Sequence, residues 1–391
     1  MVSIAEPQTS TSQRSGPIMA TAVAATISTV LPGFLVGAIS VQAIADFDIS
    51  EARYGWGIGS FFLAAMAGSA LLGKAAQKIG PRRLVVMALI VSAVASLCIA
   101  LLATQFWIFL AFLAVTGLAN SANQSAINLL LSQARIERLG LAIALKQSGM
   151  PAAALLGGLM VPLIAVTFDW RVAYGVASGM AVLAAVAVVL VLDRPGPITK
   201  ATPPPLVTDR RTLLIATVGF ACLAAVAGAL TAWTVSSAVD AGIEPGPAGL
   251  LLSAAAGCGI GVRLLLGVRL DSLSRNPLQV AAVLSSVGAI GVLIVATRSP
   301  VAVVVGSLLA FATGWVWPVL TNFAIVRVNR AAAAAATGIT QTGVYLGVFA
   351  GPLLAGVLIE TAGYAVMWLC VAVVMLIGVA IVGRMSMGEP A

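Results

Sequence analysis

The sequence predicts an all-α polytopic membrane protein with 12 transmembrane helices in two parallel, pseudo-symmetric six-helix bundles. Three observations support this fold class. Apolar residues make up 60% of the 391 residues and charged residues 9%, whereas about a quarter of the residues in a soluble domain are charged. Apolar runs long enough to cross a bilayer as helices recur along the whole chain. The second half of the chain also repeats features of the first half at a constant spacing.

The apolar runs define the spans in order. In the first half they lie near 17–40, 54–77, 84–103, 106–132, 139–166 and 171–192. In the second half they lie near 212–239, 247–270, 278–297, 300–327, 332–359 and 363–384. The first run is too long for the apolar region of a cleavable signal peptide and lacks a basic flank close to it, so it is predicted to be a span.

Composition outside the spans completes the domain organisation. Residues 1–16 are rich in Ser, Thr and Gln and are predicted to be a disordered cytoplasmic tail. The polar, proline-rich segment 193–211 is predicted to link the six-helix bundle 17–192 to the six-helix bundle 212–384. Residues 385–391 form a second short cytoplasmic tail.

The distribution of basic residues sets the orientation. Of the 21 Lys and Arg residues, 16 lie in segments that face the cytoplasm if the N-terminus is inside. The loops on the other side carry Arg53, Arg171 and Arg298, and Lys146 and Arg263 lie within spans. This asymmetry predicts a multi-pass protein of the cell (inner) membrane with both termini in the cytoplasm.

The same distribution bounds the partners. The net charge of +8 comes from basic residues in short loops between spans, so the expected partner is the lipid bilayer and not a nucleic acid. We expect a monomer. The four cysteines lie within apolar runs with neither disulfide nor metal-ligand spacing, so no cofactor or metal is expected.

A repeat relates the two halves. Gln147-Ser148-Gly149 falls on Gln341-Thr342-Gly343 at an offset of 194 residues (341 minus 147). The same offset brings Asp46 onto Asp240, Gly55 onto Gly249, Gly73 onto Gly267, and Gly157 onto Gly351. Two duplicated halves with a site between them at mid-membrane are typical of secondary transporters.

Two cations lie inside predicted spans. Lys146 has no repeat counterpart, because Thr340 stands at the equivalent position, and Arg263 lies at a similar depth. An in-span cation costs about 2.5–3.5 kcal/mol on insertion scales, so each is a candidate functional residue. No Asp or Glu falls within any predicted span to neutralise them. The alternatives are that Arg263 snorkels to the cytoplasmic surface and that Lys146 is neutral.

In-span amides and aromatic residues are further candidates. Asn120, Gln124 and Asn128 are spaced i, i+4, i+8 with Asn123 beside them, so they share one helix face that is predicted to line a wet cavity. The alternative is hydrogen bonding between helices. Trp315 and Trp317 are two residues apart and point to different faces, so at most one is expected to line the cavity, where Trp317 and Tyr345 could form an apolar wall. Ordinary packing is the alternative for both.

The loop after the second span carries a family motif. Gly73-Lys-Ala-Ala-Gln77-Lys-Ile-Gly-Pro-Arg82-Arg83 resembles the loop Gly-x-x-x-Asp-Arg-x-Gly-Arg-Arg of the major facilitator superfamily, and Gly267-Val-Arg-Leu-Asp271-Ser-Leu-Ser-Arg275 resembles its second copy. In that family the loop holds the two halves together at the cytoplasmic end. The resemblance implies gating roles for Gly73, Gln77, Arg82, Arg83, Gly267 and Asp271, with a weakened first copy because Gln77 replaces the usual Asp.

Two further resemblances concern the substrate. Arg263-Leu-Leu-Leu-Gly267 resembles the carboxylate-binding arginine segment of the monocarboxylate transporters and the oxalate–formate antiporter, in a fold that sets helices 5 and 8 face to face. Gly347-Val-Phe-Ala-Gly351-Pro352-Leu-Leu-Ala-Gly356 is similar to a motif that proton-driven drug exporters carry on helix 5, but here it lies on helix 11.

These features predict a transporter and not an enzyme. The leading hypothesis is a secondary active transporter, symporter or antiporter, that moves a small organic anion such as a mono- or dicarboxylate by alternating access. The alternative is a proton-coupled multidrug or small-molecule exporter, although the in-span carboxylate common in such exporters is missing. A non-transporting receptor or scaffold would leave the buried cations without a role. The candidate substrate-binding residues are Arg263, Lys146, Asn120, Gln124, Gln147, Gln341, Asn123, Asn128, Trp317 and Tyr345.

Overall fold

The computed structural model describes residues 15–133, 138–192, 208–329 and 332–385, and within these ranges the chain forms helices and no strands. Most of the predicted tails and of the predicted linker lies outside the described residues. The first half comprises α1 (Ser15–Ala38), α2 (Ser40–Phe47), α3 (Glu51–Tyr54), α4 (Trp56–Ile79), α5 (Pro81–Leu102), α6 (Phe106–Gln133), α7 (Leu139–Gln147), α8 (Gly149–Met160), η1 (Val161–Ala165) and α9 (Trp170–Val191). The second half comprises α10 (Arg210–Asp240), α11 (Pro245–Leu270), α12 (Pro277–Ala296), α13 (Pro300–Leu309), η2 (Ala310–Gly314), α14 (Trp317–Val328) and α15 (Ala333–Gly383).

The described helices supply the twelve predicted spans. Ten helices in the described part of the chain are long and apolar enough to cross a bilayer, and the bent pair Glu51–Ser69 and Leu71–Ile79 adds another. One of the ten, α15, has 51 residues. That is about 77 Å of helix, more than twice the hydrocarbon thickness of a bilayer.

The long helix α15 crosses the membrane twice. It is interrupted at Gly363, where φ is 80° and ψ is 170°. Gly343, near its start, lies against Thr217 in the early part of α10, and Gly383, at its end, lies against Ala282 in the early part of α12. Both ends of α15 therefore lie at the same end of the molecule, and the prediction of twelve spans is confirmed.

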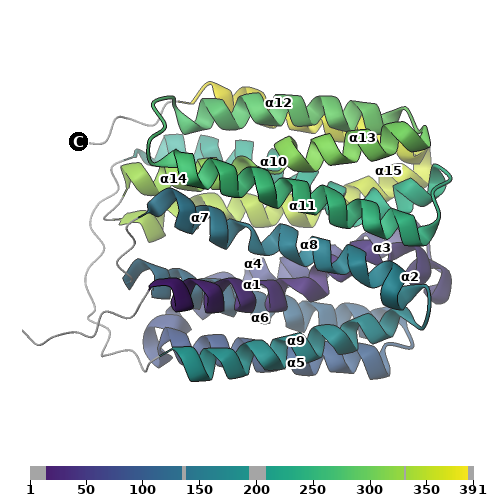
Figure 1. Cartoon of the computed structure of the whole chain (residues 1–391), viewed down its shortest axis with the longest axis horizontal. Helices are drawn as coiled ribbons and strands as arrows, with labels where there is room; N and C mark the ends of the chain where they lie inside the picture. The colour runs from purple at the N-terminus through teal and green to yellow at the C-terminus, as the bar shows by residue number, and fades with distance from the viewer. Residues whose placement is uncertain (1–14, 134–137, 193–207, 330–331, 386–391) are drawn as a thin grey trace, which may run out of the picture.

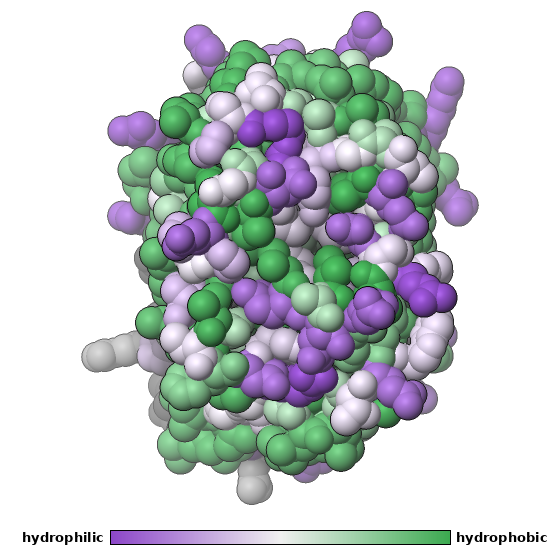
Figure 2. Space-filling view, turned by 90° about the vertical axis from the view of Figure 1, so that its right-hand side faces the viewer, coloured by the Kyte–Doolittle hydropathy of each residue, from purple (hydrophilic) through white to green (hydrophobic). Residues whose placement is uncertain are grey.

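The two halves lie side by side, with the first half in the lower part of Figure 1 and the second half in the upper part. We call the end at which α1 begins and α15 ends the terminal end, at the left of Figure 1, and the opposite end the distal end. Figure 2 shows the distal end, where hydrophilic side chains gather over the centre and hydrophobic ones surround them. This distribution is expected of a bundle whose flanks face lipid and whose ends face water.

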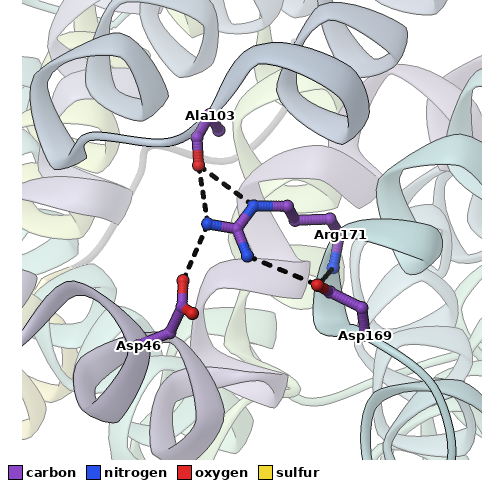
Figure 3. A network of polar contacts seen from close by, with 4 residues as sticks. All are labelled: Asp46, Ala103, Asp169 and Arg171. Atoms are coloured by element: carbon purple, nitrogen blue, oxygen red, sulfur yellow. Dashed lines mark hydrogen bonds and ion pairs between the residues drawn. The ribbon is translucent and has the colours of Figure 1, made fainter.

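Arginines at the distal end hold the loops of each half together. Arg171 donates to Asp46 at 2.7 Å, to Asp169 at 3.4 Å and to the Ala103 carbonyl at 2.8 and 3.0 Å (Figure 3). In the second half, Arg298 donates to Asp240 at 2.5 Å. Asp46 and Asp240 are repeat counterparts, so each half uses the equivalent carboxylate to fix its distal loops.

Contacts between the halves at the distal end follow the repeat. A Cβ on Gly55 would lie 3.0 Å from the Pro352 carbonyl oxygen, between α4 and α15. A Cβ on Gly158 would overlap the Gly249 carbonyl oxygen, between α8 and α11. Gly249 lies 194 residues after Gly55, and Pro352 lies 194 residues after Gly158 (249 minus 55 and 352 minus 158). The Gly55–Pro352 and Gly158–Gly249 contacts are therefore equivalent in the repeat. The parallel repeat expected from the sequence is therefore present in the packing.

The distal end is closed where these contacts meet α1 and α10. A Cβ on Gly37 would overlap the Thr231 carbonyl oxygen, so the two backbones are in direct contact. Beside them, the indole N–H of Trp233 donates to the Pro352 carbonyl at 3.0 Å, and the buried Tyr54 hydroxyl donates to the Val36 carbonyl at 2.7 Å. Backbone contacts of this kind bring the two halves together at this end.

Candidate substrate cavity and its gates

A cavity of about 70 Å³ lies between the two halves. Polar side chains of both halves line it: Gln124, Asn128, Lys146, Gln147, Thr231, Asn322, Gln341 and Tyr345. Apolar side chains complete the lining, among them Phe34, Phe62, Met150, Trp315, Trp317, Val344 and Val348. Asn128 is exposed and lies near the end of α6, so the cavity opens toward the terminal end.

Lys146 is the cation of the cavity. It lies near the end of α7, and its Nζ donates to the Asn128 Oδ1 at 2.5 Å. No Asp or Glu is among the lining residues that the structure describes, and the ion pairs it shows lie at the distal end. The Lys146 amino group is therefore held by a neutral amide, and the described lining contains no carboxylate that could balance a positive charge on it.

The predicted amide stripe divides into two parts. Gln124 and Asn128 line the cavity, as predicted. Asn120 and Asn123 are fully buried and instead contact Thr29 of α1, with the Asn123 Nδ2 donating to the Thr29 Oγ1 at 3.1 Å. The structure thus places these two amides between α1 and α6, where they connect helices, and not in the cavity wall.

Both tryptophans of the tenth span line the cavity, so the expectation that at most one would do so was wrong. The expectation assumed a regular helix, in which residues two apart point about 200° apart. Here the π-helix η2 ends at Gly314, and Trp315 has φ of −104° and ψ of 17°, which changes the direction of its side chain. Trp315 stacks on Phe34 with ring centres 5.9 Å apart, and Trp317 packs against Phe220 at 5.7 Å.

Arg263 faces α7, as the family resemblance implied, but it does not line the cavity. Its side chain is buried, with 1% of the residue exposed, so it does not snorkel to the surface. One terminal nitrogen donates to the Gln147 carbonyl at 2.5 Å and the other donates to the Trp315 carbonyl. The guanidinium also lies 4.9 Å from the centre of the Trp315 ring, which favours a cation there.

At the terminal end, described residues of α7 and α11 join the two halves, whereas Gly73 and Gln77 of the repeat-related pair, α4 and α15, make no such contact among the described residues. Between α7 and α11, Gly140 and Gly267 bring the backbones together, and the Gly140 N–H donates to both Asp271 carboxylate oxygens at 3.2 Å. Between α4 and α15, a Cβ on Gly73 would meet nothing within 4 Å, and the Gln77 side chain is exposed.

The two arginines of the first loop serve its own half. Arg82 donates to the Val189 carbonyl of α9 at 2.7 Å, and Arg83 is exposed. The loop with Asp271 therefore joins the halves, whereas the loop with Gln77 makes no such contact among the described residues. The gating roles that the resemblance implied for these loops stay a prediction.

The lining residues that the sequence did not single out are mostly apolar. Phe34, Phe62 and Met150 lie in uninterrupted apolar runs, which carry no signal for a cavity. Asn322 had a usable signal, because it is an amide within the predicted span 300–327, and it lines the cavity.

Two repeat-related six-helix halves with a cavity between them that opens at the terminal end are the architecture of a secondary transporter. The family model of the Major Facilitator Superfamily matches residues 18–335, and the chain belongs to this superfamily. The members of the superfamily are secondary transporters and not enzymes, so the protein is a multi-pass membrane transporter with a small-molecule substrate. No curated protein matches the chain.

Proposed function

We propose that the protein moves a small organic anion across the membrane by alternating access and that Lys146 binds the negative charge. The observation that carries this proposal is the ammonium group in the cavity wall, whose described partner is the Asn128 amide. An anion is the ligand that this charge attracts, because a charge in a low-dielectric cavity is costly without an opposite charge.

The lining also favours a particular class of anion. One side-chain cation lines the described cavity, whereas the Arg263 guanidinium is occupied by two backbone carbonyls. A single cation suits one carboxylate better than two. Trp315 and Trp317, which are 4% and 2% exposed, form part of the apolar lining nearby, and an apolar lining suits an apolar body. Monocarboxylates with an apolar or aromatic body are therefore favoured over small dicarboxylates.

The amides supply the remaining polar contacts. Gln124 and Gln147 from the first half and Gln341 from the second half line the same cavity as Lys146. Each amide can donate to a carboxylate and accept from a hydroxyl or amine, so these residues would orient the substrate. Because they come from both halves, a bound substrate would contact both halves at once, as alternating access requires.

The orientation in the membrane is part of the proposal. Basic residues at the terminal end outnumber those at the distal end, which supports cytoplasmic termini in the cell (inner) membrane and a cavity that faces the cytoplasm in this conformation. Cysteines at the exposed positions Arg275, at the terminal end, and Glu244, at the distal end, provide a test. In intact cells an impermeant thiol reagent should label Glu244→Cys and spare Arg275→Cys, and the reverse pattern would invert the topology.

Ligand binding by the purified protein tests the substrate class, because a bound ligand raises the melting temperature by an amount that increases with the ratio of its concentration to its Kd. The ligands are an aromatic monocarboxylate, its neutral amide, a dicarboxylate and an aromatic amine. We expect the monocarboxylate to stabilise most. Lys146→Gln should weaken its binding by about 10- to 100-fold, the range of a hydrogen bond to a charged group of about 1.5–3 kcal/mol.

The control is Lys74→Gln, which removes an exposed cation of α4 and should leave binding unchanged. Unchanged monocarboxylate affinity in Lys146→Gln would refute the role of Lys146. Preferential stabilisation by the amine would instead support the exporter hypothesis.

A further inference from the structure

The fifth span is interrupted beside the cavity. Its helix is divided into α7, which ends at Gln147, and α8, which begins at Gly149. Pro151 lies four residues after Gln147 and has no N–H, so the Gln147 carbonyl lacks the donor that a regular helix would provide. Gln147 is partly buried, so its carbonyl, without the helical donor, is stabilised by a donor from elsewhere.

The tenth span is interrupted at a similar depth in the other half. It passes from α13 through the π-helix η2 to α14, and Trp315 lies at the junction. The Val319 N–H would bond to the Trp315 carbonyl in a regular helix, but it donates to Val316 at 3.1 Å. The Trp315 carbonyl is thus a second acceptor that its own helix leaves without its usual donor.

Arg263 of α11 supplies donors to both carbonyls. Its two terminal nitrogens donate to Gln147 and Trp315 respectively, and its Nε has no hydrogen-bond partner among the described residues. A guanidinium is suited to this position because its planar fork presents several donors in fixed directions. The carbonyl dipoles and the Trp315 ring together offset the burial of the charge.

We propose that Arg263 is a positioning residue that joins the interruptions of the fifth and tenth spans, and that it acts on the conformational equilibrium of the transport cycle and not on the substrate. We call its two hydrogen bonds the Arg263 bridge. The bond to Trp315 lies within the second half, but the bond to Gln147 crosses between the halves. Relative motion of the halves therefore has to break or move the Gln147 bond.

The bridge also fixes the cavity wall. The cavity is lined by Lys146 and Gln147 on one side and by Trp315 on the other. The Arg263 bridge holds the backbone carbonyls of Gln147 and Trp315. A substrate that contacts these residues would bias the bridge, and through it the halves. This role is independent of the charge of the substrate, so it stands whether or not the cargo is an anion.

A double-mutant test follows from the chemistry of proline. Pro151→Ala restores an N–H that can donate to the Gln147 carbonyl within the helix, which removes the need for the cross-half bond. The probe is the ligand that stabilises the purified protein most among the monocarboxylate, its amide, the dicarboxylate and the amine. We expect Arg263→Leu to lower the maximal transport rate of this probe at least tenfold while changing its Kd less than threefold. Adding Pro151→Ala should recover at least a third of the lost rate.

The control is Pro32→Ala, which removes a proline inside α1 whose freed carbonyl is not an Arg263 partner, and it should rescue nothing. If Arg263→Leu does not fold, Arg263→Lys keeps the charge and provides one donor nitrogen. Its cost in transport rate should then be at least threefold smaller in the Pro151→Ala background than in the wild type.

Three outcomes would overturn the proposal. The first is an additive effect of Pro151→Ala on either Arg263 variant, which would show that the two sites are not coupled. The second is equal rescue by Pro32→Ala. The third is a rise in Kd that matches the loss of rate, which would make Arg263 a direct substrate contact. Because Lys146→Gln tests the anion separately, failure of the bridge and failure of the anion hypothesis are distinguishable.

Discussion

The contact of Asp271 with the start of α7 provides a quantitative prediction about gating. Gln77 lies 194 residues before Asp271 (271 minus 77), and Ala334 lies 194 residues after Gly140 (334 minus 140). Gly140 and Ala334 are each the second residue of a helix, α7 and α15 respectively. The repeat therefore predicts that Gln77→Asp creates, between α4 and α15, the contact that Asp271 makes between α11 and α7.

The size of the effect follows from the geometry of the existing contact. The Asp271 carboxylate shares one N–H between two oxygens at 3.2 Å at a helix N-terminus, and its side chain is exposed. A negative charge in that position stabilises by about 0.3–1 kcal/mol, and solvent screening keeps it in this range. Since 1.4 kcal/mol corresponds to a factor of ten, we expect changes of about two- to fivefold in the ratio of closed to open terminal ends.

Accessibility of the cavity measures this ratio. In the purified protein, a cysteine replacing Gln124, in a chain whose four native cysteines are replaced by alanine, should react with a thiol reagent through the terminal end. We expect Gln77→Asp to slow labelling by about two- to fivefold and Asp271→Asn to accelerate it by a similar factor. High salt should reduce both effects, because exposed charges are screened.

The matched control is Gln77→Asn, which keeps a neutral amide at the same position. Equal labelling rates in Gln77→Asp and Gln77→Asn would refute the reasoning, since the predicted contact depends on the carboxylate charge. An effect of Gln77→Asp that survives high salt unchanged would also contradict it.

Two further substitutions test the distal end and the start of the second half. Gly37→Val should push α1 and α10 apart, because a Cβ at this position overlaps the Thr231 carbonyl. Overpacking of about 2 kcal/mol corresponds to a roughly 30-fold shift away from the closed distal end, which labelling of a distal-end cysteine would measure. Gly179→Val, at an exposed position, is the control and should have no effect. Asp209 precedes α10, and hydrogen bonding from Thr212 lowers the pKa of its carboxyl below the usual value. Its stabilising effect is therefore present above the unfolded-state pKa and is lost as the pH falls through the folded-state pKa, so Asp209→Ala should lower the melting temperature at pH 7 and the difference should vanish in acid. A difference that grows as the pH falls would contradict this assignment.

The fold was predictable because a bilayer permits few solutions. Spans had to be helical, and their number and order followed from the apolar runs. The repeat was visible in glycines such as Gly55 and Gly249, and the structure shows why they are glycines: each allows a neighbouring backbone from the other half to approach closely. Repeated backbone contacts leave repeated small residues, which a sequence displays directly.

The cavity was predictable where polarity alone decided it. Lys146, Gln124, Asn128, Gln147 and Gln341 line the cavity as the sequence suggested. Asn120 and Asn123 have the same polarity on the same helix, but each hydrogen-bonds Thr29 of another helix through one atom of its amide. One helix face contains both kinds of amide, so periodicity cannot separate residues that face water from residues that face a partner.

The surroundings of Arg263 and the direction of Trp315 could not be predicted from a sequence pattern, for a different reason. The direction of Trp315 depends on a local departure from helical geometry, and the partners of Arg263 are backbone carbonyls, which have no side-chain identity to read. The prolines at positions 151 and 318 mark both interruptions. The packing of three helices decides which distant donor reaches a carbonyl beside such an interruption, and the sequence does not show this packing.

The positions at which the two halves differ explain how a repeated fold can prefer one conformation of the transport cycle. The duplicated residues make equivalent distal contacts, Gly55 with Pro352 and Gly158 with Gly249. The residues that differ between the halves lie where function needs asymmetry: Lys146 against Thr340 in the charge of the cavity, and Asp271 against Gln77 at the terminal end. Because the Asp271 interface is joined and its Gln77 counterpart is apart, the cavity can open to one side without separating the halves completely. A carboxylate at position 77 would remove that difference, which is why this one substitution tests whether the asymmetry of the sequence sets the preferred conformation.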